Sequence, residues 1–487
     1  MLLRRCELDG QLRDVRISGE CIAAVAPELA PLPGELERDA AGGALLPGLN
    51  DHHLHLYGAA AALRSVQCGP PAVRGAGALA DALARAPGAG WLRGVGYHES
   101  VAGPLGRDQL DRWLAARPVR IQHRTGALWM LNGAAIAELG LDAGVDAPGI
   151  ERDAAGRATG RLFRLDAWLG ARLPRERVSL AELSRRLARC GVTGVTDAGA
   201  DNDASRFGAL AEAQRAGELL QRAIVMGDAS LPAASTPELA RGALKLLLDE
   251  RALPELGAFC ARIAAAHRAG RAAAVHAVTR VELTFALAAF AEVGAQLGDR
   301  IEHASVAPPE SVETIRRLGL TVVTQPSFIS ERGDAYARDV EPADRPWLYR
   351  TRGFLAAGVP LAAGSDAPYG EPDPWRAMRA AVARRSEGGH VLGSAEALTP
   401  EEALALFTSP LEAPGGAAPR LGSGTRADLC LLRAPWLRAR CALSADLVAA
   451  TWRAGELIFE ADVARANPRA PSGAAGDSPR PATPGGE

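Results

Sequence analysis

The sequence predicts an α/β fold, a (β/α)8 TIM barrel, in which eight parallel strands alternate with helices. Short apolar runs recur along the middle of the chain, and amphipathic or alanine-rich segments lie between most of them, for example 180–190, 281–293 and 309–318. Polar residues also interrupt the apolar runs near their ends, where barrel enzymes place their active sites. After a first strand within 45–55, the predicted strands are 192–198, 222–227, 243–249, 273–278, 300–305, 321–326 and 360–366.

The first predicted strand ends in a polar cluster with the sequence DHHLH. Side chains alternate between the two faces of a strand, so Asp51, His53 and His55 share one face and His52 lies on the other. Two imidazoles two residues apart can bind one metal ion, and neutral imidazole is a common zinc ligand. A surface strand that carries histidines by chance is the alternative, and His52 is expected to pack.

Composition narrows the class of protein. The 487 residues carry a formal net charge of -2 and no basic block, so nucleic acid is not an expected partner. No apolar run is long enough to span a membrane, and charges near the N-terminus argue against a signal peptide. Seven scattered cysteines without CxxC spacing favour a reducing cytoplasm over a disulfide scaffold.

The chain divides into predicted parts. Alternating patterns at both ends predict a small β-sandwich domain built from residues 1–46 and 418–462. The barrel is expected over residues 47–417. A stretch at about 68–178 is too long for a loop and predicts an inserted subdomain that caps the barrel mouth. Residues 465–487 are rich in Pro, Gly, Ala and Ser and are expected to be disordered.

Lys245 is the single lysine of the chain, and it stands within the apolar run ALKLLL. A guanidinium keeps its proton at working pH, whereas a buried amine can lose it. This difference suggests a chemical reason for a lysine at this position. The alternative is a lysine at a strand end that extends to solvent.

Polar side chains on several predicted strands point to a shared centre. A buried polar group without a partner is costly, so a group of them needs a common partner, which a metal ion supplies. Any one of these residues could instead be a hydrogen-bonded core residue. The candidates are His53, His55, Lys245, His276, His303 and Asp366.

Six motifs of the chain resemble the amidohydrolase superfamily, and within it amidohydrolase family 3, the YtcJ-like and N-substituted formamide deformylase-like enzymes. The resemblance covers about residues 1–460, with the motifs in matching order. They are PGLNDHHLH (47–55), GVTGVTDAG (191–199), VHAV (275–278), RIEHAS (300–305), TQP (324–326) and AGSDAPYGEPDPW (363–375).

The resemblance implies a divalent metal centre, with zinc as the expected metal and two ions per chain, although one ion remains open. His53 and His55 match the first pair of metal ligands, and His276 and His303 match the ligands of the second metal. Lys245 matches a lysine that relatives carboxylate to a bridging carbamate. Asp366 matches the catalytic aspartate that binds the first metal and moves the proton. The resemblance leaves a homodimer open.

Substrate contacts are expected from the insert and from the loop after the last strand. Aromatic rings and hydrogen-bonding groups there would suit a small, partly apolar amide, although ordinary packing is the alternative for each residue. Relatives often carry Asp-Gly-His in the insert, where this chain has Thr-Gly-Ala at 125–127. The candidates are His98, His123, Arg124, Trp129 and Tyr369.

The sequence therefore predicts a cytoplasmic, metal-dependent hydrolase that cleaves a C–N bond of a small amide, formamide or cyclic amide. The expected nucleophile is a hydroxide formed from metal-bound water, with Asp366 taking the proton. Two alternatives remain: a deaminase on the same barrel, which would not need a carboxylated Lys245, and a non-catalytic protein that binds a small molecule.

Overall fold

A parallel sheet of eight strands forms the centre of the molecule, in the order β6-β13-β14-β15-β16-β17-β18-β19. The computed structural model describes residues 1–70, 72–174, 177–233 and 235–462. The strands are β6 (Leu49–Leu54), β13 (Val192–Asp197), β14 (Arg222–Gly227), β15 (Leu239–Leu247), β16 (Ala273–Ala277), β17 (Arg300–His303), β18 (Thr321–Thr324) and β19 (Leu361–Ala363).

The segment after β19 joins the last strand to the first. The Asp366 N–H donates to the His53 carbonyl at 2.7 Å, and the His55 N–H donates to the Ala367 carbonyl at 2.8 Å. Gly364 lies so close to His53 that a Cβ there would meet backbone atoms at 2.5 Å, which explains the glycine. The predicted barrel fold is therefore confirmed, as a nearly closed barrel.

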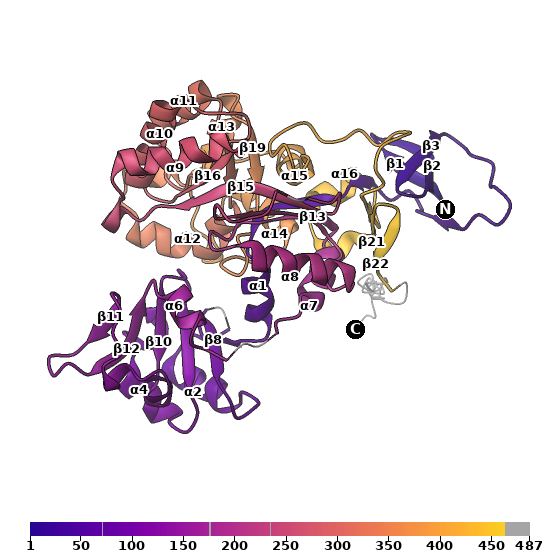
Figure 1. The fold of residues 1–487 in the computed structure, drawn as a ribbon. Helices are drawn as coiled ribbons and strands as arrows, with labels where there is room; N and C mark the ends of the chain where they lie inside the picture. Colours follow the sequence, from indigo (N-terminus) through magenta and orange to yellow (C-terminus); the bar gives the residue numbers. More distant parts are fainter. Residues whose placement is uncertain (71, 175–176, 234, 463–487) are drawn as a thin grey trace, which may run out of the picture.

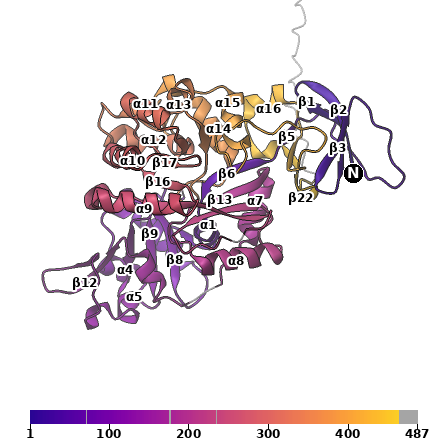
Figure 2. The ribbon, with the colours of Figure 1, turned by 45° about the horizontal axis from the view of Figure 1, so that its top comes forward.

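Helices connect most of the strands and cover the outside of the sheet (Figures 1 and 2). The described residues between β14 and β15 form no helix, in a Pro- and Ser-containing stretch, so this step departs from the regular alternation. The helices are α1 (Leu56–Leu63), α7 (Ala181–Arg189), α8 (Ala204–Arg215), α9 (Leu256–Arg268), α10 (Arg280–Val293), α11 (Pro309–Leu318), α12 (Ser327–Asp339), α13 (Arg352–Ala356), α14 (Pro374–Ala383), α15 (Pro400–Thr408) and α16 (Trp436–Ala442).

Apolar burial is unequal on the two sides of the barrel strands. The large core lies between strands and helices, with residues such as Val195, Leu246 and Phe290. A separate small cluster consists of Ala198, Met226 and Ala274, each on or next to a barrel strand. The polar residues of the same strands therefore have few apolar neighbours inside the barrel.

Both chain ends contribute to two further sheets of four strands each, with the orders β3-β2-β1-β4 and β22-β21-β20-β5. They share one apolar core that includes Leu3, Val15, Leu429 and Trp452. Figure 1 shows the first strands beside β21 and β22. Residues 463–487, which contain the predicted disordered tail, lie outside the described residues. The strands are β1 (Leu2–Leu8), β2 (Gln11–Ser18), β3 (Cys21–Ala26), β4 (Glu37–Asp39), β5 (Leu45–Pro47), β20 (Leu429–Leu432), β21 (Val448–Arg453) and β22 (Glu456–Glu460).

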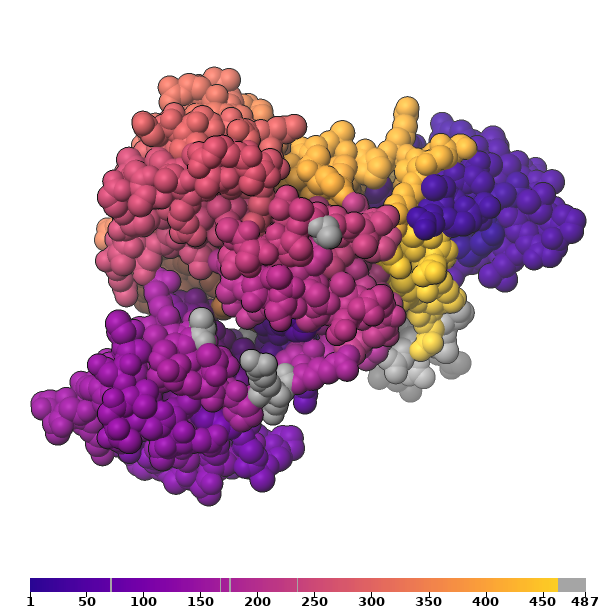
Figure 3. Space-filling model, in the orientation of Figure 1, coloured from indigo at the N-terminus to yellow at the C-terminus, as the bar shows by residue number. Residues whose placement is uncertain are grey.

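The long stretch between α1 and α7 folds around a mixed sheet of six strands, in the order β11-β12-β10-β9-β8-β7. Its two apolar clusters contain residues of this stretch and no barrel strand. Figure 3 shows it as a lobe beside the barrel. Its elements are β7 (Val66–Gln67), α2 (Ala76–Ala84), β8 (Leu92–Tyr97), α3 (Glu99–Ala102), α4 (Arg107–Trp113), β9 (Val119–His123), β10 (Leu128–Leu131), α5 (Gly133–Glu138), β11 (Ile150–Arg152), β12 (Ala158–Phe163) and α6 (Asp166–Gly170).

The helices of the described ranges show no membrane span, since none of them is both long enough and apolar enough to cross a bilayer.

Candidate metal centre

Strand β6 carries the first part of the site. His53 is fully enclosed, and its Nδ1 donates to the Glu302 carboxylate. Asp51, on the same face, accepts the backbone N–H groups of His53 at 3.1 Å and of Ser365 at 3.0 Å. His52 points the other way, and its Nε2 lies 3.1 Å from the Ser409 hydroxyl, as strand alternation predicts. Of the three histidines in this stretch, His52 therefore packs against Ser409, and His53 and His55 face the barrel interior.

Asp366 brings a carboxylate to the two facing histidines. Its Oδ1 lies 3.5 Å from His53 Nε2 and 3.2 Å from His55 Nε2. One ligand atom from each of the three residues lies within 4.8 Å of the others, which suits a metal ion. Burial alone would raise the pKa of Asp366, but the hydrogen bond with His55 and the neighbouring imidazoles of His53 and His303 hold it below its ordinary value.

His276 and His303 complete a compact group of four imidazoles. The His303 ring centroid lies 4.6 Å from that of His276 and 4.7 Å from that of His53. His303 has φ +70°, a left-handed conformation that is uncommon outside glycine and turns the chain at the end of β17. Its Nδ1 lies 2.6 Å from Gln325 Oε1, which accepts its proton and leaves Nε2 free to bind a cation.

Lys245 lies in the same interior, on β15. Its side chain is 2% exposed, and burial lowers the pKa of its amine to about 8. Among the described residues its Nζ has no hydrogen-bond partner, and Glu302 Oε2 is 4.0 Å away. A buried amine without a hydrogen bond is costly unless another group is bound nearby or the amine is modified.

Glu302 lies in the motif RIEHAS but is not among the site residues predicted from the sequence. Its carboxylate accepts hydrogen bonds from His53 Nδ1 and from Arg300 Nε. Arg300 also donates to the His52 carbonyl at 3.0 Å, so it ties β17 to β6. The available signal was a carboxylate directly before the ligand candidate His303 in the predicted strand, and a carboxylate of this kind fixes the tautomer of a ligand histidine.

Tyr369 lies at the edge of this cluster. Its ring centroid is 5.6 Å from that of His55, and its backbone N–H donates to the Asp366 carbonyl at 2.8 Å. A Cβ at Gly126 would lie 2.6 Å from the Tyr369 ring, so the loop between β9 and β10 of the insert touches this tyrosine. The predicted contact residue Tyr369 thus lies where the insert meets the barrel mouth.

The other predicted contact residues belong to the insert and have varied surroundings. His98 and His123 have ring centroids 6.0 Å apart, and His123 Nε2 lies 3.0 Å from Glu99 Oε2. Trp129 packs in the interior of the insert, where its indole N–H donates to Asp166 Oδ1 at 2.8 Å. Arg124 follows β9 and is half-buried. The indole of Trp129 thus already has its partner within the insert.

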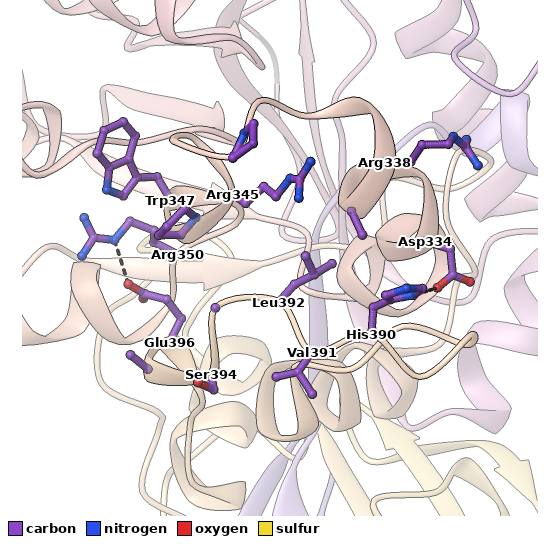
Figure 4. Close-up of a pocket in the computed structure, with 15 residues that line it drawn as sticks. Asp334, Arg338, Arg345, Trp347, Arg350, His390, Val391, Leu392, Ser394 and Glu396 are labelled. Atoms are coloured by element: carbon purple, nitrogen blue, oxygen red, sulfur yellow. Dashed lines mark hydrogen bonds and ion pairs between the residues drawn. The ribbon is translucent and has the colours of Figure 1, made fainter.

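Two pockets border helix α12. One, of about 990 Å³, is lined by the end of α12 and two later loops, and Figure 4 shows Asp334 bound to His390 and Arg350 to Glu396 there. Its lining, like that of the second pocket, includes none of the four clustered histidines. The other, of about 930 Å³, lies at the ends of β16 and β17 and is lined by Val278 and Ser305. This second pocket therefore begins two residues beyond His276 and His303.

The structure is a (β/α)8-type barrel whose interior brings together side chains that could hold a metal ion. A sequence model of the amidohydrolase family matches residues 37–459, so the chain belongs to the amidohydrolase family. The enzyme class predicted from the sequence, a hydrolase of carbon–nitrogen bonds other than peptide bonds, is confirmed.

The chain is also similar to individual known proteins, among them the following three. N-substituted formamide deformylase of Arthrobacter pascens is 28% identical, over 86% of this chain and 89% of the relative. Putative amidohydrolase YtcJ of Bacillus subtilis (strain 168) is 25% identical, over 75% of this chain and 79% of the relative. The solved structure of an uncharacterized metal-dependent hydrolase from Pyrococcus horikoshii OT3 has a TM-score of 0.68 at 21% identity, covering 89% of this chain and 96% of that chain. The family resemblance found in the motifs is thereby confirmed.

Proposed function

We propose that this amidohydrolase is a metal-dependent enzyme that cleaves the C–N bond of a small amide, formamide or cyclic amide. The observation that carries the proposal is the cluster of His53, His55 and Asp366, with His276 and His303 against it. The similarity to N-substituted formamide deformylase supports an amide-type substrate.

The chemistry of the donor atoms supports a bound cation. Burial, together with the charge of Lys245, lowers the pKa of His53 to about 3, so its imidazole is neutral. Its Nδ1 donates to Glu302, and its Nε2 lone pair therefore faces the Asp366 carboxylate at 3.5 Å. A lone pair and a carboxylate oxygen repel each other unless a cation lies between them. Imidazole and carboxylate ligands suit zinc, which is the metal that we propose.

We extend the proposal to two ions, with Lys245 as a carbamate between them. Carbon dioxide adds only to an unprotonated amine, and burial brings the pKa of Lys245 to about 8. The addition would form an N–C bond and release one proton from the nitrogen to solvent, which converts a buried amine without a hydrogen bond into an anion with two donor oxygens. His53, His55 and Asp366 would hold one ion, and His276 and His303 the other.

A bound divalent metal would supply Lewis acidity, which lowers the pKa of water and polarises a carbonyl group. The residues of the chain supply the remaining functions. Asp366 Oδ1 would accept the proton of the attacking water and return it to the departing nitrogen. Glu302 would hold His53 in one tautomer, and Gln325 would do the same for His303.

The pocket at the ends of β16 and β17 supports a partly apolar substrate. Val306, Leu348 and Phe285 contribute apolar surface, and Tyr336 and Tyr349 contribute phenol groups. Its volume of about 930 Å³ falls within the range of small-molecule sites. We propose that it receives the part of the substrate away from the scissile bond. The free cysteines of the described chain accord with the cytoplasmic location that we propose.

Hydrolysis of a panel of N-substituted formamides and cyclic amides tests the proposal, with released amine as the readout. The enzyme is measured as purified, after metal removal with a chelator, and after addition of zinc. We expect activity to disappear on removal and to return on addition. His390→Gln is the matched control, because this histidine is exposed and bonds Asp334 outside the cluster. Activity that survives complete metal removal would contradict the proposal.

A further inference from the structure

Three hydroxyl groups lie in a row in the wall of the pocket at the ends of β16 and β17. Ser305 follows β17, two residues after His303, and is 2% exposed. The Tyr349 N–H donates to the Ser305 carbonyl at 2.8 Å, which holds these two residues together. The Tyr349 hydroxyl lies 3.2 Å from the Tyr336 hydroxyl. Because all three residues line the pocket, Ser305, Tyr349 and Tyr336 form a polar strip in its wall.

Tyr349, the middle residue of the polar strip, is held in a fixed position. Its φ of +42° lies in the left-handed region, which a bulky residue adopts only where the surrounding structure imposes it. Its ring lies edge-on to Phe328, with centroids 5.7 Å apart, and its centroid is 5.8 Å from that of Tyr336. Burial raises the pKa of Tyr349 well above its ordinary value, so the phenol keeps its proton. The hydroxyl is therefore a fixed, uncharged hydrogen-bond donor.

The polar strip has more hydrogen-bonding capacity than its own members can use. Three hydroxyl groups in a row have three protons to donate, and the two contacts along the row can use only two of them. Ser305 Oγ is buried and has no hydrogen bond of ordinary geometry within the described ranges. A buried hydroxyl without a partner is costly, so the strip is suited to a ligand that brings a further polar atom.

The other polar side chains of the pocket wall already have partners or face solvent. The Thr284 hydroxyl donates to the Arg280 carbonyl at 2.8 Å, and the Thr279 hydroxyl caps α10. Arg280 and Asp344 form an ion pair at 3.0 Å, and Glu250 is exposed. Among the described lining residues, the polar strip is therefore where a buried ligand atom can gain side-chain hydrogen bonds. The rest of the wall is apolar: Leu253, Val278, Val281, Phe285, Ala288, Val306, Val340 and Leu348.

We propose, on the basis of the proposed amide hydrolysis, that the polar strip selects substrates with an uncharged oxygen, a hydroxyl or carbonyl group, on the part away from the scissile bond. In a formamide that part is the N-substituent. Ser305 and Tyr349 would determine this specificity, and the strip begins two residues beyond the proposed ligand His303. A charged group would be disfavoured there, since the strip offers only neutral donors within an apolar wall.

Isosteric pairs of probes isolate the contribution of the oxygen. N-Benzylmethanesulfonamides with a hydroxyl group at ring position 2, 3 or 4 are each compared with the methyl compound substituted at the same position, which has nearly the same size. The sulfonyl group resists hydrolysis, so binding is measured by calorimetry on the zinc-loaded protein without turnover. We expect the hydroxyl compound of at least one position to bind about 10-fold more tightly than its methyl partner.

Removal of a hydroxyl from the polar strip should remove that preference. In Tyr349→Phe and in Ser305→Ala, the affinities of the same two probes should agree within about 2-fold. Thr284→Val is the matched control for the ratio of the two affinities, because it removes a hydroxyl of the same wall whose proton goes to the Arg280 carbonyl, and the preference should persist. Should Tyr349→Phe be unfolded by circular dichroism, Ser305→Ala decides.

Methyl compounds that bind as tightly as their hydroxyl partners at all three ring positions would overturn the proposal. No binding of any probe would overturn it as well, as would an unchanged preference in the folded Tyr349 or Ser305 variant. Failure of the proposed function has a different signature. The corresponding N-(hydroxybenzyl)formamides would then release no amine, while the sulfonamides would keep the hydroxyl preference.

Discussion

The barrel interior and the interior of the insert both contain buried polar side chains, but these side chains differ in whether the chain itself supplies their hydrogen-bond partners. In the insert, Trp129 donates to Asp166, and Asn132 caps α5 and bonds three backbone groups. In the barrel, Lys245 Nζ has no hydrogen-bond partner among the described residues, and His53 Nε2 faces a carboxylate. Buried polar side chains that find hydrogen-bond partners within the chain indicate a structural role. Buried polar side chains without such partners indicate that another group binds there.

The largest expected effect is the loss of the barrel carboxylate. Asp366→Asn should lower kcat/KM by about 1,000-fold or more, because it removes both a ligand and the proton acceptor. Asp166→Asn is the comparison in the insert and should leave kcat/KM within about 3-fold, since the side-chain bonds of Asp166 within the described residues go to Trp129 and Gln122 of the insert. Steady-state kinetics on the best formamide measures both variants. Equal losses at the two positions would break the distinction between the two interiors.

A change at the lysine should be nearly as severe. Lys245→Arg keeps the positive charge but cannot form a carbamate, so we expect at least a 100-fold loss of kcat and about one metal ion fewer per chain. The readouts are kinetics and elemental analysis. Arg241→Lys, a charge-preserving change earlier on the same strand, serves as the control. An active Lys245→Arg enzyme with full metal content would refute the bridging role.

A smaller effect is expected for Glu302, which would act on the metal only through His53. Glu302→Gln should weaken metal binding about 10- to 100-fold, because the carboxylate that orients His53 is replaced by an amide. Competition with a chromophoric chelator gives the affinity. High metal concentration should restore much of kcat, which a merely unfolded variant would not allow. An unchanged affinity would show that Glu302 serves packing alone.

The smallest effect tests the insert. Trp129→Phe removes the hydrogen bond to Asp166 and should lower the free energy of unfolding by about 1 kcal/mol, with kcat/KM unchanged. Urea unfolding and kinetics measure the two quantities. Trp91→Phe, in which a more exposed indole loses its bond to Glu138, is the matched control and should cost less. A 10-fold loss of kcat/KM in Trp129→Phe would assign the indole to the substrate instead.

The sequence predicted the barrel because its strands are short apolar runs with helices between them. The predicted helices 309–318 and 281–293 match α11 and α10 closely. The strand expected at 360–366 ends earlier, at Ala363, and the chain beyond it turns at Asp366, which has φ +53°. The strand expected at 243–249 begins at Leu239, since β15 extends along β14.

Strand alternation alone could not place both Glu302 and His303 in the site. It places Glu302 and His303 on opposite faces, but the left-handed conformation of His303 brings both to the same interior.

Elemental analysis of the purified protein is the most direct test of a metal centre in the barrel, because the proposed hydrolysis requires the cluster to hold metal. We predict about two zinc-like ions per chain in the native protein. We predict a loss of at least one ion in the double variant His53→Ala/His55→Ala and no loss in His390→Gln. About one ion in the native protein would favour a mononuclear site and remove the bridge from Lys245. No bound metal after reconstitution with zinc, in a folded protein, would contradict the account.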